Sequence, residues 1–308
     1  MRRAIPKLPL LMSSLLTAAA IANLALEAKH TSVASISSAY AQVKAHDRIV
    51  AVGGAITEIL YAIGLQDEIV GVDTTSVHPP EAMRDKPSVG YVRALSAEGV
   101  LSLNPSLVIA IDGAGPPDAV KLLDASGVRI AHIPDAFSAE GVVDRIRKVA
   151  ALTNARDLGD KLAADVAVGF AKVEEARARI EKPKRVLFIL SLLNGKVMAS
   201  GRNTSAEAMI RLAGGVNALD AFEGYKPVND EAITAAQPDF VLVMSRGDHA
   251  LTAEQVFALP AFATTPAARA GGFASKDGQY LLGFGPRTPD AALELMRAIY
   301  GVAATGKS

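Results

Sequence analysis

A tyrosine directly after a glycine is the strongest candidate for chemistry in this sequence of 308 residues. Tyr91 follows Gly90 between two apolar segments. In α/β domains, loops at the ends of strands line ligand crevices. A tyrosine phenolate is a hard anionic oxygen donor that suits ferric iron, and the iron and a nearby guanidinium both favour its ionised form. By position alone, a Gly-Tyr pair is more often a packed turn with a solvent-facing hydroxyl.

Other reactive patterns are missing from the sequence. Its five histidines include no pair at the three- or four-residue spacing of a helical metal site, and no Gly-x-Ser-x-Gly elbow occurs. The chain has no cysteine, which excludes disulfides, thiolate metal sites, a cysteine nucleophile and the thiol that anchors a bacterial lipoprotein. No catalytic constellation is therefore predicted, and a cleft hydrolase is only a remote alternative.

The charges are balanced and unevenly placed. Lys and Arg total 32, as do Asp and Glu, without a long run of one sign, which argues against a nucleic-acid surface. Four of the basic residues and one acidic residue lie in 1–41, so residues 42–308 carry a net charge of −3. The basic start, the apolar run of 8–26 and the Ala39-Tyr40-Ala41 step predict a secretory signal over 1–41. An uncleaved membrane anchor is the alternative.

Short apolar strands alternate with helical patterns from Asp47 onward. This alternation predicts an α/β lobe over 42–152 with a mainly parallel sheet. Its strands are expected at 48–52, 68–72, 107–111 and 128–133, and its helices at 56–63, 96–103, 118–126 and 139–152.

The period changes after residue 153, where apolar residues recur at helical spacing as far as residue 180. We expect one long amphipathic helix over 154–182, within a linking segment 153–183, with Asn154 as its cap and Pro183 as its stop. A second α/β lobe follows over 184–308. Its strands are expected at 185–190, 196–199, 240–244 and 279–282, and its closing helix at 289–300.

The two lobes share a weak repeat. Gly90-Tyr91 and Gly224-Tyr225 are each followed by a helical stretch and then by a strand that begins after a proline. The tyrosine-to-proline spacing is 14 residues in the first copy and 13 in the second. Two related lobes that face each other across a cleft are the simplest arrangement for such a repeat.

Several blocks of the sequence resemble the haem-binding periplasmic proteins of bacterial haem ABC importers, which are class III periplasmic binding proteins. The first-lobe block Gly90-Tyr91-Val92-Arg93 and the ending Leu282-Gly283-Phe284-Gly285-Pro286-Arg287 are typical of the haem branch. The resemblance covers residues 47–302, and its further blocks are 94–99, 103–108, 200–210, 212–215, 224–227 and 288–289. It implies two Rossmann-like α/β lobes joined by one long backbone helix, with the ligand in the cleft between the lobes.

The resemblance also implies roles for individual residues. Tyr91 takes the position of the axial iron ligand, and Arg246 that of an arginine which faces the tyrosine and binds the phenolate or a propionate. A solvated loop arginine is the alternative for Arg246. Arg93 is a second candidate for a propionate, with capping of the following helix as its alternative. Tyr225 is a candidate to stack on the porphyrin, with a packed turn as its alternative. His249 is more consistent with an exposed loop residue.

The implied function is to bind ferric haem in the periplasm and to deliver it to the permease of an inner-membrane ABC importer. Glu58 and Glu207, each on the first helix of a lobe, are expected to dock the two lobes onto the permease; a capping box with Thr204 is the other interpretation of Glu207. The protein is expected to be a monomer without catalytic activity and without a lipid anchor. A vitamin B12 or ferric-siderophore binder of the same fold is the nearer alternative.

Overall fold

The computed structural model describes residues 47–193, 195–245 and 251–301. The predicted signal segment 1–41, Arg246 and His249 lie outside these residues. Within the described ranges, no helix combines the length and the apolar character that are needed to cross a bilayer.

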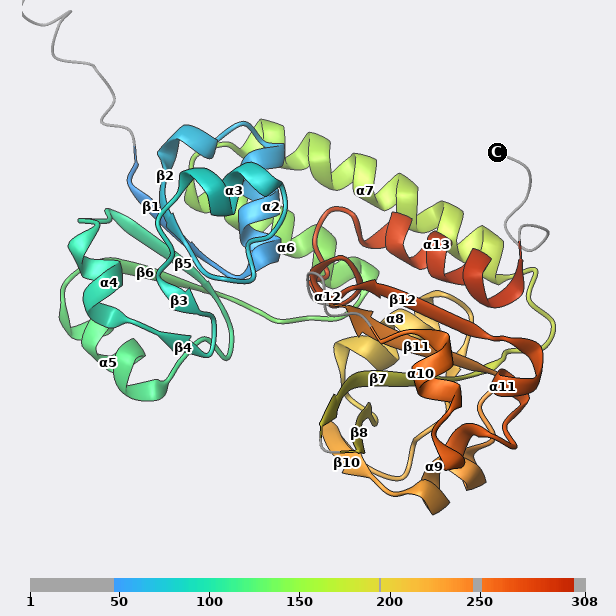
Figure 1. Ribbon diagram of the computed structural model, residues 1–308. Helices are drawn as coiled ribbons and strands as arrows, with labels where there is room; N and C mark the ends of the chain where they lie inside the picture. The colour runs from blue at the N-terminus through green and yellow to red at the C-terminus, as the bar shows by residue number, and fades with distance from the viewer. Residues whose placement is uncertain (1–46, 194, 246–250, 302–308) are drawn as a thin grey trace, which may run out of the picture. The chain divides into compact units, whose positions relative to one another are not determined.

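The first lobe is built on a parallel sheet of four strands in the order β2-β1-β5-β6 (Figure 1). The strands are β1 (Ile49–Val52), β2 (Ile69–Val72), β5 (Leu107–Ile111) and β6 (Arg129–Ile133). A short antiparallel hairpin, β3 (Gly90–Tyr91) with β4 (Ala94–Leu95), stands apart from this sheet. The helices are α2 (Gly54–Ala62), the 3-10 turn η1 (Gln66–Glu68), α3 (Pro80–Asp85), α4 (Ala97–Ser102), α5 (Pro117–Ala125) and α6 (Ala139–Leu152).

Helices cover both faces of this sheet, which explains the unbroken apolar strands of the sequence. In β1, Ile49 and Ala51 belong to the same buried cluster as the apolar residues of α2 and α6. Val50 and Val52 point to the opposite face, where they join the cluster of α4 and α5. The expectation of an α/β lobe with a parallel sheet is therefore confirmed.

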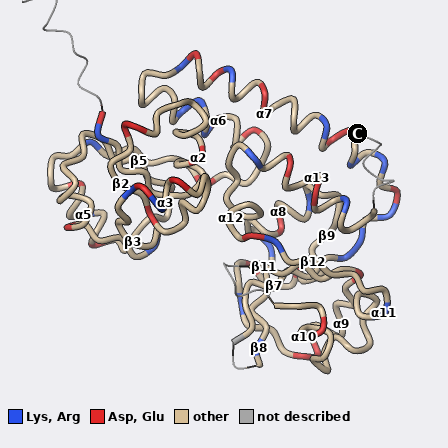
Figure 2. Tube along the Cα trace, turned by 45° about the horizontal axis from the view of Figure 1, so that its top comes forward, with Lys and Arg blue, Asp and Glu red and all other residues tan. Residues whose placement is uncertain are grey.

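The long helix is α7 (Arg156–Arg177), which has 22 residues and is about 33 Å long at ~1.5 Å per residue. It packs along α6 and along α13, and charges of both signs follow its length (Figures 1 and 2). Its predicted limits were too wide. Asn154 does not cap it: this residue has a φ of 57°, and Ala155 precedes the helix without a side-chain cap. After Arg177, Arg179 and Ile180 donate to carbonyls three residues back, so the chain leaves the α-helix in a tighter turn before Pro183.

The second lobe has a mixed sheet in the order β10-β8-β7-β11-β12, with β9 beside β7. The hairpin β7–β8 and the pair β8–β10 are antiparallel, whereas β7, β11 and β12 are parallel. The strands are β7 (Arg185–Leu193), β8 (Lys196–Ser200), β9 (Val216–Asn217), β10 (Tyr225–Val228), β11 (Phe240–Ser245) and β12 (Phe273–Asp277). The helices are α8 (Ser205–Leu212), α9 (Asp230–Ala236), α10 (Ala253–Phe257), η2 (Pro260–Phe262), α11 (Pro266–Ala270), α12 (Gly278–Leu282) and α13 (Thr288–Tyr300).

One predicted strand is wrong. Residues 279–282 lie in helix α12, and the strand is the preceding segment β12. The side chain of Asp277 accepts a hydrogen bond of 2.8 Å from the backbone N–H of Tyr280 and so starts the helix. A run of three apolar residues has no period that distinguishes a strand from a buried helical turn.

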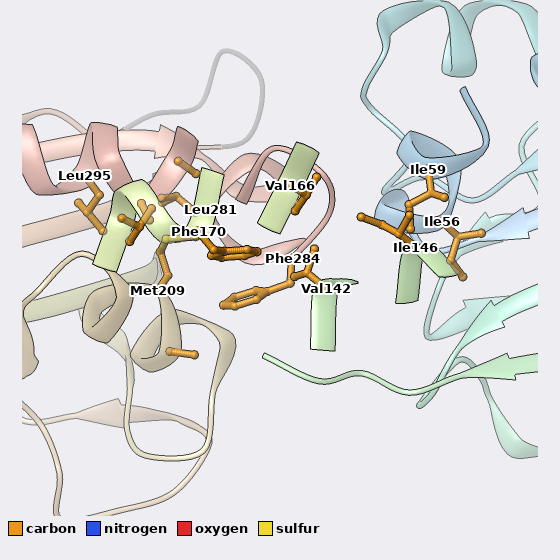
Figure 3. Close-up of a cluster of buried hydrophobic side chains, with 14 of the residues drawn as sticks. Ile56, Ile59, Val142, Ile146, Val166, Phe170, Met209, Leu281, Phe284 and Leu295 are labelled. Carbon is orange, nitrogen blue, oxygen red and sulfur yellow. The ribbon is translucent and has the colours of Figure 1, made fainter. Parts of the chain in front are cut away.

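A single buried cluster extends through both lobes (Figure 3). It contains Ile56 and Ile59 of α2, Val166 and Phe170 of α7, and Leu295 of α13. The described residues from 47 onward accordingly belong to one compact unit. The lobes are therefore joined by shared packing as well as by the chain.

Candidate functional site

Tyr91 lies on the β3–β4 hairpin, and its side chain is 43% exposed. The hairpin follows β2: Val72 forms a bridge with Ser88, and the N–H of Thr74 donates to the Gly90 carbonyl at 2.9 Å. The hairpin is also tied to Gly115, which follows β5, through backbone hydrogen bonds of 2.7 and 2.9 Å. The carboxyl ends of parallel strands meet at one edge of a sheet, so Tyr91 stands at the edge where α/β folds bind ligands.

Glycine is required at position 90. Its φ is +99°, and a Cβ atom there would lie 2.8 Å from the Ala94 carbonyl oxygen. Any other residue would therefore strain the hairpin or push its strands apart. The Gly-Tyr pair of the sequence fixes the direction from which Tyr91 leaves the backbone.

A buried carboxylate holds the loop that carries this hairpin. Asp73 is fully buried, and its oxygens accept hydrogen bonds from the N–H of Gly53 at 2.8 Å and the N–H of Thr75 at 2.9 Å. The hydroxyl of Thr75 donates to it at 2.8 Å, and that of Ser76 at 3.1 Å. Asp73 thus joins the start of α2 to residues 73–76, whose Thr74 N–H holds Gly90. Sequence reasoning missed this residue, although an aspartate immediately after an apolar strand was a visible signal.

Arg93 is exposed in the turn of the hairpin, two residues from Tyr91. Its Nη1 donates to the Gly113 carbonyl at a long 3.4 Å, so the guanidinium retains most of its hydrogen-bonding capacity. Burial raises the pKa of Asp135, and the positive charges of Arg145 and Arg93 oppose this rise. The alternative role in capping is taken by Ser96, whose hydroxyl accepts from the Gly99 N–H at the start of α4.

Tyr225 is in the equivalent place of the second lobe but in a different environment. Its hydroxyl shares a hydrogen bond of 3.1 Å with Ser205, and its ring meets the ring of Phe188 edge-on at 6.3 Å. The side chain is half-buried on β10. In both copies of the repeat a Gly-Tyr strand leads into a capped helix and a strand, but Tyr91 is the more exposed of the two.

The carboxylates of the two glutamates expected to dock a permease already accept hydrogen bonds within the protein. The side chain of Glu58 is 5% exposed, and its carboxylate accepts two hydrogen bonds from Arg287, at 2.6 and 3.1 Å. Glu207 accepts from the Asn203 N–H at 2.7 Å, while its own N–H donates to the Thr204 hydroxyl at 3.0 Å. The predicted cap by Thr204 is present, but the carboxylate binds one residue before it. In this structure the Glu58 side chain is almost entirely buried.

A cavity of about 580 Å³ borders Arg287 and contains none of the predicted ligand-binding residues. It is lined by Val77, His78, Asp277, Tyr280, Arg287, Asp290 and Glu294. Across residues 47–193, 195–245 and 251–301, no group of three or more His, Asp or Glu side chains is arranged to hold a metal ion.

Comparisons with known proteins give consistent results. A family model described as periplasmic binding protein matches residues 49–280. Two solved structures, the periplasmic heme-binding protein BhuT with two hemes and the periplasmic heme-binding protein RhuT from Roseiflexus sp. RS-1 in apo form, are each 38% identical to this chain. Each alignment has a TM-score of 0.78 and covers 84% of this chain and 99% of the other.

More distant similarity extends to cobalamin binders. The vitamin B12-binding protein of Salmonella typhimurium is 26% identical over 209 residues, which cover 68% of this chain and 76% of that protein. In another curated relative the matched segment spans only 62% of its length. The higher identity to the two heme-binding structures separates them from this group.

Proposed function

We propose that this chain, which belongs to the periplasmic binding protein family, binds ferric haem and passes it to the permease of an inner-membrane ABC importer. The observation that carries the proposal is an exposed tyrosine on a rigid hairpin in a chain that is 38% identical to two heme-binding proteins. Such a protein binds and releases its ligand and catalyses no reaction. Its family indicates the periplasm, and we propose that residues 1–41 direct export and are then removed.

Tyr91 is proposed to bind the iron. A phenolate oxygen favours Fe(III) over Fe(II), and one axial bond leaves the opposite face of the haem open for release. The porphyrin itself supplies the four equatorial nitrogens, which agrees with a site where the described residues form no metal cluster. Burial of the apolar macrocycle contributes about 25 cal/mol per Å² of surface removed from water.

Arginines are proposed to bind the acidic groups of the ligand. Arg93 is exposed beside Tyr91, and a propionate is a suitable partner for its remaining N–H groups. Arg246, outside the described residues, is proposed for the second lobe. Tyr225 is proposed to contact the porphyrin with its ring, because its hydroxyl is occupied by Ser205.

Docking to the permease is proposed through Glu207 and Glu58 in a monomeric protein. The carboxylate of Glu207 lies at the N-terminus of α8, where its charge also suits the helix dipole. For Glu58 the pair with Arg287 would have to open first. If this proposal is right, Glu207→Gln lowers haem-stimulated ATP hydrolysis by the reconstituted importer and leaves hemin binding intact. Equal stimulation by the two proteins would remove Glu207 from the docking surface.

A hemin titration followed by visible absorption tests the proposed iron ligand. Tyr91→Phe removes only the phenolic oxygen, and Tyr225→Phe is the matched control because it removes the equivalent oxygen of the second lobe. We expect the wild type and Tyr225→Phe to give a high-spin ferric spectrum with a phenolate-to-iron charge-transfer band, and Tyr91→Phe to lack that band. A band that survives in Tyr91→Phe would contradict the proposal.

The cobalamin alternative is tested in the same titration. The relationship to a vitamin B12-binding protein makes cyanocobalamin the appropriate competitor. We expect that an excess of cyanocobalamin does not displace hemin and does not bind the free protein. Binding of cyanocobalamin together with an unchanged hemin spectrum on addition of protein would favour the alternative.

A further inference from the structure

Residues 283–287, which connect α12 to α13, leave the second lobe and pack against the first. We call this segment the clasp. Arg145 of α6 donates from Nη1 to the carbonyls of Gly283 at 3.2 Å and Phe284 at 2.8 Å. These hydrogen bonds join residues 138 and 139 positions apart in the chain. They connect a helix of the first lobe directly to the clasp.

Arg145 is bound equally firmly within its own lobe. Its side chain is 1% exposed, and Nη2 donates to the Pro134 carbonyl at 3.1 Å and to the Asp135 carboxylate at 3.2 Å. Burial lowers the pKa of Arg145, and the charge of Asp135 opposes this change. A buried arginine with so many carbonyl partners has a high desolvation cost and fixes one geometry, so a positional role explains its presence better than stability does.

Aromatic packing completes this contact. Phe284 is 1% exposed and adopts a φ of 49°, and its ring centroid lies 5.2 Å from that of Phe137 in the loop before α6. Figure 3 places Phe284 within the cluster that includes Val142 of α6 and Phe170 of α7. The ring therefore fills the space between helices of the first lobe and the linking helix.

A second interaction with the first lobe, an ion pair, lies at the other end of the clasp. Arg287 donates to both oxygens of Glu58 on α2, across 229 positions of sequence. Burial lowers the pKa of Arg287, but the hydrogen bond and charge of Glu58 more than offset this and raise it overall. A Cβ atom at Gly285 would lie 3.0 Å from Glu58 Oε2 and 3.5 Å from the Ala55 Cα, so the clasp crosses α2 where only a glycine fits without displacement.

The groups that hold the clasp also support the hairpin of Tyr91. The α2 helix of Glu58 begins at Gly54, next to the Gly53 N–H that Asp73 binds. Asp135, the partner of Arg145, lies within range of the charge of Arg93. Helix α2 and the hydrogen bonds of Asp73 thus connect the clasp to the loop that holds the hairpin.

We propose that the clasp sets the separation and orientation of the two lobes in the ligand-free protein, and that Arg145, Glu58 and Arg287 are positioning residues for the bound haem. Besides α7 and the shared apolar packing, the clasp gives the second lobe two polar links to the first. The two links restrict rotation of the second lobe because they are made to different helices, α6 and α2. The part of the proposal that concerns haem rests on the function proposed above; the part that concerns lobe geometry does not.

Distance measurements between spin labels test the proposal without ligand. The chain has no cysteine, so Leu122→Cys on α5, where the side chain is 62% exposed, and Ala235→Cys on α9 provide one labelling site per lobe. Pulsed electron paramagnetic resonance then gives the distribution of distances between the two spin labels in four backgrounds: wild type, Arg287→Met, Arg287→Lys and Asp85→Asn. Asp85 is the control because its pair with Arg84 is exposed and lies within one lobe.

We expect one narrow distribution in the wild type and in Asp85→Asn, a broad or shifted one in Arg287→Met, and an intermediate one in Arg287→Lys, which keeps the charge but not the paired geometry. A purely stabilising contact would lower the urea midpoint and leave the distribution in native buffer unchanged. An unchanged distribution in folded Arg287→Met would overturn the proposal. Glu58→Gln, which keeps the shape of the side chain, provides the same test should Arg287→Met fail to fold.

Hemin dissociation, measured with an excess of an apo-globin as acceptor, tests the role in ligand binding. We expect about tenfold faster release from Arg287→Met than from Asp85→Asn, with the charge-transfer band retained. Faster release with a broadened distribution supports both parts of the proposal. A broadened distance distribution with an unchanged rate of hemin release would refute the ligand-positioning role and support the role of the clasp in lobe geometry. Failure of the wild type to bind hemin would refute only the function proposed above.

Discussion

Replacement of Asp73 by asparagine should destabilise the protein strongly, although the two side chains have the same shape. One carboxylate oxygen accepts the Gly53 N–H at 2.8 Å, and the other accepts the Thr75 N–H at 2.9 Å. An amide offers one oxygen and one NH₂ group, so in either orientation one of these backbone donors faces another donor. The lost hydrogen bond to a charged group costs about 1.5–3 kcal/mol, and the unsatisfied buried donor adds about 1–3 kcal/mol.

The two costs add to about 2.5–6 kcal/mol, which can be measured by urea unfolding. For a domain of this size the dependence of the unfolding free energy on urea is about 3 kcal/mol per M, so the midpoint should fall by about 1–2 M with an unchanged slope. Asp118→Asn is the control, because that side chain is 92% exposed and its pair with Lys121 contributes little. A loss below about 0.5 kcal/mol in Asp73→Asn would mean that the N–H groups find other partners, and the proposed anchoring of the hairpin would be refuted.

Two further predictions concern the second lobe. Phe284→Ala should lower the free energy of unfolding in urea by about 3–5 kcal/mol, because it leaves a cavity where a buried ring was. The control is Val168→Ala on α7, where the side chain is exposed and the change should be less than about 0.5 kcal/mol. Comparable losses in the two variants would contradict the buried packing of Phe284. Burial raises the pKa of Tyr280 to about 12, with smaller contributions from nearby carboxylates. The folded protein then keeps this proton where the unfolded chain releases it, so stability falls as the pH rises from about 10 to about 12. The melting temperature across this pH range should fall less steeply in Tyr280→Phe than in the wild type. Equal pH dependence of the two melting temperatures would refute the assignment of this loss to Tyr280.

Local pattern was sufficient for most of the secondary structure. The limits of β5 and α6 were predicted to the residue, because a fully buried strand and a helix capped by Ser138 both have clear sequence signals. The α12 helix was mistaken for a strand because three consecutive apolar residues do not define a period. The cap of α7 was misplaced because Asn154 is used for the left-handed turn out of α6, a role that asparagine also favours.

The candidate site was likewise predicted only in part from the sequence. The Gly-Tyr pattern was enough to select Tyr91 and Tyr225, but only the fold separates an exposed phenol on the β3–β4 hairpin from one that is hydrogen-bonded to Ser205. The pairing of Glu58 with Arg287 had no local signal, and Glu58 was therefore expected at the surface.

What the amino-acid sequence by itself determined is the alternation of strands and helices, the long helix between two lobes, and a tyrosine presented by a glycine turn. All of these depend on residues close together in the chain, where hydrophobic period, caps and backbone sterics act. The tertiary structure alone decided which groups are buried together. Arg145 meets the clasp, and Glu58 meets Arg287 over 229 positions, because the packing of α2, α6 and α7 brings these side chains together, and no local pattern contains that information.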